Sequence, residues 1–162
     1  MDLEAAKTRL FVALGRELRD ERTLNAMERI PREAFIPPGR RHASYDDIAI
    51  PIGEGQTISQ HFIVALMISS LQVQPKDKVL DVGTGSGYQA AILSRLANEV
   101  ITVERAPVLV KKAKRTLHNL GFYNVNVLPA GEVLGCPEKA PFNAIVVGAG
   151  ALLYQISTRR RR

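Results

Sequence analysis

Residues 78–104 combine glycines and acids in an order that could bind a nucleotide-type ligand. An apolar segment, VLDV, runs into a loop, GTGSG, with glycines at positions 83, 85 and 87. A segment with helical character follows, and a second apolar segment, VITVE, ends at Glu104. Strand, glycine loop, helix and strand make up half of a doubly wound α/β sheet, which binds such ligands at the ends of its strands.

The details of this stretch select the ligand. A dinucleotide-binding loop spaces its glycines G-x-G-x-x-G, but here the third glycine arrives one residue early and Tyr88 follows it. Asp81 would repel a pyrophosphate and suits a ligand that carries an ammonium group and no phosphate. S-adenosylmethionine is such a ligand, because its amino group and its sulfonium are both cationic. Glu104 can accept hydrogen bonds from both ribose hydroxyls, so the stretch predicts a methyltransferase cofactor site.

Purely structural roles are open to the same residues. Glycines after a strand can form a tight turn and nothing more. Asp81 could cap backbone amides of the glycine loop, because aspartate readily binds nearby amides. A dinucleotide-dependent dehydrogenase is the weaker alternative, since Tyr88 and Asp81 both depart from its pattern.

The elements around this stretch are those of an α/β protein. Apolar residues at three- and four-residue steps predict helices, with Asp20 capping the second one. Pro107 is expected in the first turn of a later helix, Gly121 after its end, and Ser59 at the opening of another. Proline and glycine between residues 30 and 55 predict extended segments and turns. The expected helices cover about residues 3–18, 21–29, 60–71 and 107–119, and the expected strands cover 48–52, 79–82, 100–103, 125–128 and 142–147.

The chain of 162 residues is long enough for one domain with a real core. We expect a single methyltransferase domain over residues 1–150. Within it, residues 1–58 supply N-terminal helices and substrate-side loops, and residues 75–148 the cofactor-binding α/β core. Residues 151–162 form an atypical basic tail.

Cysteine content and hydropathy predict the cellular compartment. Cys136 is the only cysteine, so no internal disulfide can form, which fits the reducing cytoplasm. The charged N-terminus does not resemble a signal peptide. No apolar run approaches the roughly 20 residues of a membrane helix. We therefore expect a cytoplasmic protein without membrane association.

The formal net charge of +6 is only weak support for nucleic-acid binding. Four of the 22 basic residues are Arg159–Arg162, and the other 18 face 16 acidic residues. A terminal arginine run can bind phosphates through counterion release, but no aromatic side chains for base stacking accompany this one. A nucleic-acid-binding module that uses the tail stays a minor alternative, and no nucleic-acid partner is expected.

Five segments of the chain carry a resemblance to a known family. The chain resembles protein-L-isoaspartate O-methyltransferases over about residues 20–150. The segment PIGEGQTIS (51–59) is the most specific, because methyltransferases in general share only the glycine loop. The five segments are RIPREAFIP (29–37), YDDIAIPIGEGQTISQ (45–60), VLDVGTGSGYQAAIL (79–93), ITVER (101–105) and APFNAIVVGAG (140–150).

The resemblance implies a Rossmann-like, S-adenosylmethionine-dependent methyltransferase fold with N-terminal helices. It also implies methyl transfer to the free carboxylate of isoaspartyl residues in damaged proteins and peptides. The methyl ester then collapses to a succinimide, which can reopen as normal aspartate. A carboxylic acid with a pKa of about 4 is already ionised at neutral pH, so positioning can suffice without a general base. His42, His61 and His118 lack metal-ligand spacing, and no metal is expected.

The resemblance further assigns roles to residues. Ser59 matches the active-site residue of the family, where a hydroxyl at a helix start can meet a carboxylate beside free backbone amides. A role for Ser59 as a helix N-cap is compatible with this. Glu104 is expected to bind the ribose, and the glycine loop to hold the methionine end of the cofactor. The implied cofactor-binding residues are Gln56, Thr57, Ile58, Asp81, Gly83, Thr84, Gly85, Ser86, Gly87 and Glu104.

Two departures from the family pattern bear on activity. The family carries Gly-Asp-Gly after the third strand, but here Gly131 stands at the Asp position, and Glu132 could replace it if the loop shifts by one residue. Losing one charge-assisted hydrogen bond would weaken cofactor binding about ten- to hundredfold. Beyond GAG the chain reads ALLYQISTRRRR, which predicts a fold truncated after its fourth sheet strand. A truncated remnant, weak or inactive but with residual cofactor binding, is the main alternative to a repair enzyme.

Overall fold

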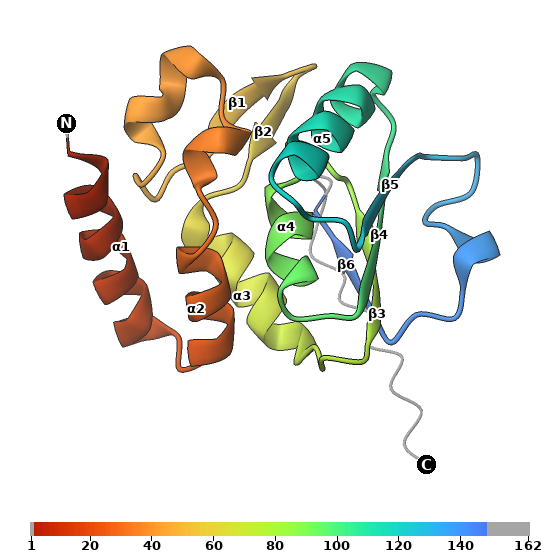
Figure 1. Cartoon of the computed structure of the whole chain (residues 1–162), viewed down its shortest axis with the longest axis horizontal. Coiled ribbons are helices and arrows are strands. Elements are labelled where there is room, and N and C mark those ends of the chain that lie inside the picture. Colours follow the sequence, from red (N-terminus) through yellow and green to blue (C-terminus); the bar gives the residue numbers. More distant parts are fainter. Residues whose placement is uncertain (1, 149–162) are drawn as a thin grey trace.

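Helices and strands follow one another in the expected α/β order in the computed structural model, which describes residues 2–148 (Figure 1). The helices are α1 (Leu3–Glu17), α2 (Glu21–Glu28), α3 (His61–Leu71), α4 (Tyr88–Ser94) and α5 (Pro107–Asn119), with 3-10 helices η1 (Arg32–Phe35), η2 (Pro38–Ala43) and η3 (Pro137–Lys139). The strands are β1 (Ile50–Gly53), β2 (Gln56–Ile58), β3 (Lys78–Val82), β4 (Glu99–Glu104), β5 (Val125–Pro129) and β6 (Ala144–Val147). The predicted basic tail with Arg159–Arg162, and the last two residues of the GAG segment, lie outside the described residues.

A four-stranded parallel sheet in the order β5-β4-β3-β6 forms the centre of the fold. The chain builds β3, β4 and β5 outward in one direction and then places β6 on the other side of β3. In open α/β sheets, ligands bind at the carboxyl ends of the strands where the strand order reverses. That point lies between β3 and β6.

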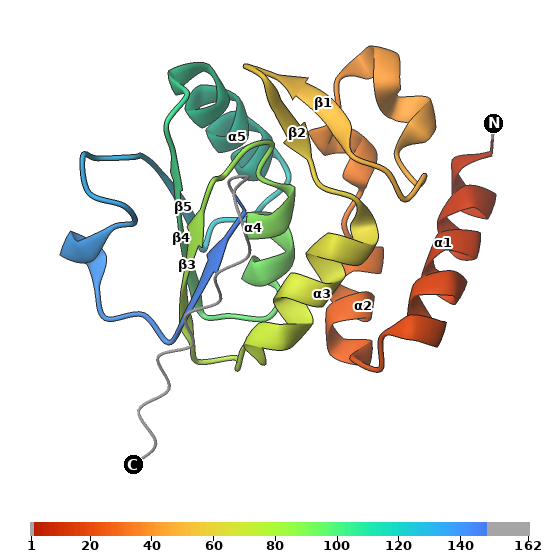
Figure 2. The ribbon, with the colours of Figure 1, turned by 180° about the vertical axis from the view of Figure 1, so that it is seen from behind.

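The two faces of the sheet are covered differently (Figures 1 and 2). Helices α4 and α5 pack on one face, where Val79 and Val100 belong to the main core. The segment 130–143, with buried Cys136, lies against the other face, toward which Leu80 and Ile101 point. Alternate residues of each strand thus point to opposite faces of the sheet and belong to two different apolar clusters. The predicted α/β fold with N-terminal helices is confirmed.

Several helix starts and ends lie where the sequence predicts them. Asp20 caps α2, because its side chain accepts a hydrogen bond from the Thr23 amide. Pro107 begins α5, and Gly121 follows the end of that helix with a φ of +78°. None of the helices within residues 2–148 is long and apolar enough to cross a membrane.

Three local predictions are wrong. Ser59 does not cap α3: the N-cap is Gln60, without a side-chain hydrogen bond, and the Phe62 amide donates instead to Asp47 Oδ1 at 2.9 Å. Ile48 precedes β1 and is half exposed, so the strand is shorter than expected. Strand β6 also begins later than predicted, because the Asn143 side chain, rather than a strand carbonyl, accepts from the Lys78 amide at 2.8 Å.

Candidate functional site

The glycine loop leaves the carboxyl end of β3 at the point where the strand order reverses. Gly83, Gly85 and Gly87 have φ values of +99°, +54° and +90°, which other residues rarely adopt. A Cβ atom at Gly87 would lie 3.1 Å from a Leu117 methyl on α5. The glycines therefore permit both the tight turn into α4 and its close packing against α5.

Glu104, at the end of β4, holds this loop in place. Its Oε2 accepts from the Gly85 amide and its Oε1 from the Ala106 amide, both at 2.9 Å. Each carboxylate oxygen has capacity for a further hydrogen bond. Glu104 thus anchors the loop and keeps acceptor sites for a ligand at the carboxyl edge of the sheet.

Asp81 lies fully buried beneath the loop. Its carboxylate accepts from Gln89 Nε2 and from Thr102 Oγ1, both at 2.9 Å. Thr84 Oγ1 lies 2.7 Å from Thr102 Oγ1, and because the Thr102 hydrogen goes to Asp81, Thr84 donates to Thr102. The prediction that Asp81 could cap glycine-loop amides is wrong, since Glu104 takes the Gly85 amide.

The environment of Asp81 disfavours its charged form. Burial raises the pKa of Asp81 to about 6, with a further contribution from the negative charge of Glu104. The hydrogen bonds from Thr102 and Gln89 oppose this rise in pKa only in part. A cation bound nearby would favour the ionised form of Asp81.

A small cavity of about 40 Å³ lies between the glycine loop and the end of β2 with the following Ser59. It brings together seven of the eleven residues that the sequence assigned to the site. Gln56 is exposed at the start of β2, and Asp81, Gly87 and Glu104 support the loop without lining the cavity. The lining residues are Thr57, Ile58, Ser59, Val64, Gly83, Thr84, Gly85, Ser86, Tyr88, Gln89 and Gly148.

Sequence reasoning did not assign Gln89 or Gly148 to the site. Gln89 lines the cavity and donates to Asp81. Its position in the first turn of the helix after the glycine loop was the available signal. Gly148 follows β6, and a Cβ atom there would lie 3.3 Å from Gln89 Nε2. Gly148 reaches the site because β6 returns beside β3.

A buried arginine beneath Ser59 also escaped the sequence analysis. Arg32 has no exposed surface, and its Nη2 donates to the Ser59 carbonyl oxygen at 2.8 Å. The guanidinium lies 4.9 Å from the centre of the Tyr88 ring. Within residues 2–148 its Nε and Nη1 have no hydrogen-bond partner, and no carboxylate lies within 4.0 Å of it. Arg32 therefore fixes the backbone at Ser59 and places positive charge behind the cavity.

The three histidines lie in structural or solvent-exposed positions. His61 is buried, with Nε2 2.9 Å from the Ser44 carbonyl oxygen. Burial, together with the positive charge of Arg32, lowers the pKa of His61 to about 3, so the ring is neutral. His42 and His118 are exposed. The described part of the chain contains no cluster of three or more His, Cys, Asp or Glu side chains that could hold a metal ion.

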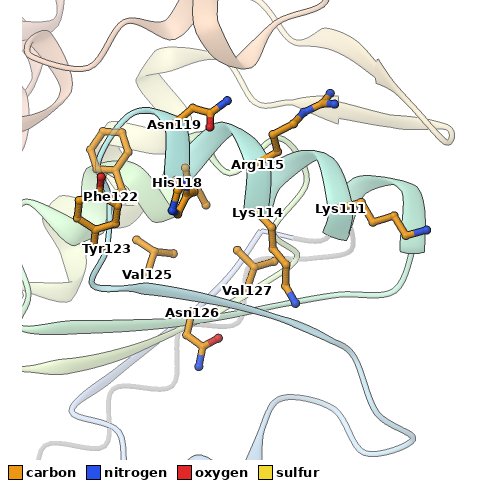
Figure 3. A pocket seen from close by; sticks show the side chains of 11 residues that line it. Lys111, Lys114, Arg115, His118, Asn119, Phe122, Tyr123, Val125, Asn126 and Val127 are labelled. Carbon is orange, nitrogen blue, oxygen red and sulfur yellow. The ribbon is translucent and has the colours of Figure 1, made fainter.

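A much larger cavity, of about 590 Å³, lies between α5 and β5 (Figure 3). None of the residues assigned to the site lines it. The smaller cavity is the better candidate for methyl-transfer chemistry, because it lies where the strand order reverses and contains the glycine loop and Ser59.

Comparisons with known proteins give the family. The family model for protein-L-isoaspartate(D-aspartate) O-methyltransferase matches residues 6–153. Protein-L-isoaspartate O-methyltransferase 1 of Geotalea uraniireducens (strain Rf4) is 49% identical over 154 residues, covering 91% of this chain and 70% of that protein. Protein-L-isoaspartate O-methyltransferase 2 of Marinobacter nauticus is 52% identical over 136 residues, covering 84% of this chain and 62% of that protein. The chain thus spans between 62% and 70% of the length of these two relatives.

Solved structures agree with the family match. A protein-L-isoaspartate O-methyltransferase superposes with a TM-score of 0.78 and 30% identity, over 89% of this chain and 48% of that one. The Plasmodium falciparum protein-L-isoaspartate O-methyltransferase in complex with S-adenosyl-L-homocysteine superposes with a TM-score of 0.74 and 26% identity. This match covers 88% of this chain and 73% of that one. With a family model that matches most of its length and relatives that share about half of its residues, the chain belongs to the protein-L-isoaspartate(D-aspartate) O-methyltransferase family.

Proposed function

We propose that this chain transfers a methyl group from S-adenosylmethionine to the free carboxylate of isoaspartyl residues in damaged proteins, as a repair enzyme of the cytoplasm. The observation that carries the proposal is the meeting of Ser59 and the glycine loop in one cavity at the reversal of strand order. The family match, over most of the chain, supports the same reaction.

The residues around the cavity fit S-adenosylmethionine. None of the lining side chains is positively charged, and the acids Asp81 and Glu104 stand beneath and beside the loop. This charge pattern suits a cationic ligand without phosphates. When bound, S-adenosylmethionine supplies a methyl group on a positively charged sulfur. Glu104 would hold the ribose, and the glycine loop the methionine part.

Gln89 would connect the ammonium group of the cofactor to Asp81. Its side-chain nitrogen donates to Asp81, and its oxygen is an acceptor for an ammonium at the cavity. The charge of Asp81 then acts on the ligand through Gln89 rather than by direct contact. This role replaces the direct contact that the sequence suggested.

The small volume of the cavity limits what it can enclose. About 40 Å³ is far below the roughly 300 Å³ or more of a pocket that buries a whole cofactor. We therefore infer that it seats only the reacting end, while the rest of the cofactor lies along the carboxyl ends of β3 and β4. Ser59 would orient the acceptor carboxylate at this end, and Arg32 would hold the Ser59 backbone in place. Proximity and orientation then supply the rate enhancement.

Ser59→Ala is expected to lower methyl-ester formation on an isoaspartyl peptide about ten- to hundredfold, the effect of losing one hydrogen bond to a carboxylate. Transfer of label from S-adenosylmethionine to the peptide measures this effect. Ser70→Ala is the matched control, because Ser70 lies exposed on α3 and donates to the Leu66 carbonyl oxygen, away from the cavity. Equal rates for Ser59→Ala and the wild type would remove Ser59 from the mechanism.

Cofactor binding should also depend on pH through Asp81. The pKa of Asp81 is raised to about 6, above its ordinary value of 3.8, so the acid is ionised only above about pH 6. The ammonium group of S-adenosylhomocysteine favours the ionised form of Asp81, so the affinity for this ligand is expected to fall several-fold between about pH 7 and about pH 5. Titration calorimetry across this range gives the dependence.

Asp81→Asn is the control for the pH dependence. The variant should bind more weakly at neutral pH, and its affinity should be flat over the same range. The stability of the unliganded protein depends on pH in the opposite direction from the binding affinity. Because Asp81 is buried, its ionisation lowers the free energy of unfolding as pH rises from about 4 to about 6. A wild-type affinity that does not change with pH would show that the charge of Asp81 does not reach the ligand.

A further inference from the structure

The large cavity between α5 and β5 has the shape of an open groove with a basic wall. Its apolar floor includes Val125, Val127 and Phe122, and basic side chains of α5 line one side. Lys114 points from α5 toward β5 beside Val127, and Lys111 lies along the same helix (Figure 3). We call this feature the α5–β5 groove, lined by Lys111, Lys114, Arg115, Leu117, His118, Asn119, Phe122, Tyr123, Val125, Asn126 and Val127.

Positive charge is concentrated at this groove. Residues 105–131 contain five Lys and Arg residues and not one Asp or Glu. The described part of the chain holds 18 basic and 16 acidic residues, so 13 basic residues face 16 acidic ones outside this segment. Within residues 2–148, Lys111, Lys114 and Arg115 form no ion pair. The groove is therefore a basic surface on an otherwise slightly acidic body, which favours an acidic partner.

One edge of the groove is an open strand edge. In the part of the chain that the structure describes, β5 pairs only with β4. Asn124 accepts from the Val100 amide and Ala130 donates to the Glu104 carbonyl oxygen, so the even-numbered residues direct their peptide groups toward β4. By the alternation of a parallel ladder, the N–H and C=O groups of Val127 point outward. They are free to pair with another extended chain.

We propose that the α5–β5 groove binds an extended, acidic segment of a partner protein, which adds a strand to the edge of β5. The backbone of the segment would bond the outward peptide groups of β5, and its acidic side chains would face Lys111 and Lys114. The apolar side chains that alternate with them would lie on the opposite face of the sheet, beside Leu128. The proposal does not depend on the proposed methyl transfer, because the groove shares no residue with the smaller cavity.

Two alternative roles of the α5–β5 groove lead to different binding behaviour. Lysine beside an open strand can serve only to prevent edge-to-edge aggregation. A basic groove with an exposed aromatic residue, here Tyr123, can also bind single-stranded nucleic acid through phosphates and base stacking. The protective role predicts no peptide binding, and the nucleic-acid role predicts tighter binding of an oligonucleotide.

The test uses a fluorescent peptide of about ten residues that alternates Glu and Val, the length of a long strand. Fluorescence anisotropy is expected to show saturable binding, weakened about tenfold or more by Lys111→Glu with Lys114→Glu. The matched control, Lys76→Glu with Lys139→Glu, makes the same charge change at exposed positions outside the groove and should bind as the wild type does. Thermal melting confirms that both double variants are folded.

A second peptide separates strand addition from charge attraction alone. N-methylation of alternate residues removes the N–H groups on one edge of the peptide and keeps its charge, and it should weaken binding about tenfold. Equal binding of the methylated peptide would overturn the proposal, as would absence of peptide binding. An oligothymidylate that binds more tightly than the acidic peptide, and competes with it, would also overturn it in favour of a nucleic-acid site.

Discussion

Glu104→Ala is expected to weaken binding of S-adenosylhomocysteine by about a hundredfold or more, the largest effect on cofactor binding that we predict. The change removes the proposed acceptor for the ribose. It also releases the Gly85 and Ala106 amides, which Glu104 holds at 2.9 Å. Two hydrogen bonds to a charged group are worth about 1.5–3 kcal/mol each. Isothermal titration calorimetry measures the dissociation constant directly.

Glu99→Ala is the matched control for this prediction. Glu99 opens the same strand at its other end, where it pairs with Lys78 at 3.6 Å near the surface. Its loss should leave the affinity within about twofold of the wild type, since exposed ion pairs contribute little. A Glu104→Ala protein that stays folded and binds S-adenosylhomocysteine as tightly as the Glu99→Ala protein would refute the assignment of Glu104.

Arg32→Met is expected to raise the KM for an isoaspartyl peptide about tenfold or more, with a smaller effect on kcat. Arg32 is a fully buried cation whose Nη2 lies 2.8 Å from the Ser59 carbonyl oxygen, and within residues 2–148 no carboxylate lies within 4.0 Å of it. A carboxylate bound at Ser59 would meet this positive charge in a site of low dielectric. Methyl transfer neutralises that carboxylate, so the charge favours substrate binding more than the transition state. Steady-state kinetics separates the two constants.

The same substitution should change stability little. Met fills a similar volume, and replacing a buried charge by an apolar side chain is often neutral or stabilising. The lost hydrogen bond to Ser59 acts in the opposite direction, by about 1–3 kcal/mol. A melting temperature close to that of the wild type, together with a raised KM, would separate substrate binding from folding.

Arg95→Met is the control, because its guanidinium also lies over an aromatic ring, 4.7 Å from the centre of Phe122, but away from the cavity. It should leave KM unchanged, and Arg32→Lys should restore part of the affinity because it keeps the charge. A KM for Arg32→Met equal to that of the Arg95→Met protein would show that Arg32 is only structural.

Local chemistry explains which parts of the fold could be predicted. The cap by Asp20, the start of α5 at Pro107 and the turn at Gly121 each depend on residues close in sequence. The glycine loop was equally readable, since its positive φ angles require glycine whatever surrounds it. Hydrophobic periodicity then placed the helices and strands of the core.

The contacts that decide the site are long-range, and the sequence pattern does not contain them. Asp81 pairs in register with Thr102, which puts the Thr102 hydroxyl on its carboxylate. Glu104 lies two residues further along β4 and therefore reaches the Gly85 amide, the role that the sequence allowed to Asp81. The register of the strands, rather than the residue type, therefore determines which groups these two acids bind.

Arg32 was missed for a different reason. An arginine in a proline-rich segment is expected at the surface, yet η1 turns it inward onto Tyr88 and the Ser59 carbonyl. The N-terminus of α3 was also predicted wrongly, because it depends on a residue that is distant in sequence. Ser59 has the right residue type for an N-cap, but Asp47, fifteen residues away in sequence, takes the Phe62 amide.

The most direct test of the proposed function is methyl transfer from labelled S-adenosylmethionine to two peptides that differ only in one isoaspartyl or one normal aspartyl residue. The wild-type chain is expected to label the isoaspartyl peptide alone. Label on neither peptide, from folded protein, would contradict the proposal and make the chain an inactive relative of the family. Equal label on both peptides would contradict the substrate assignment.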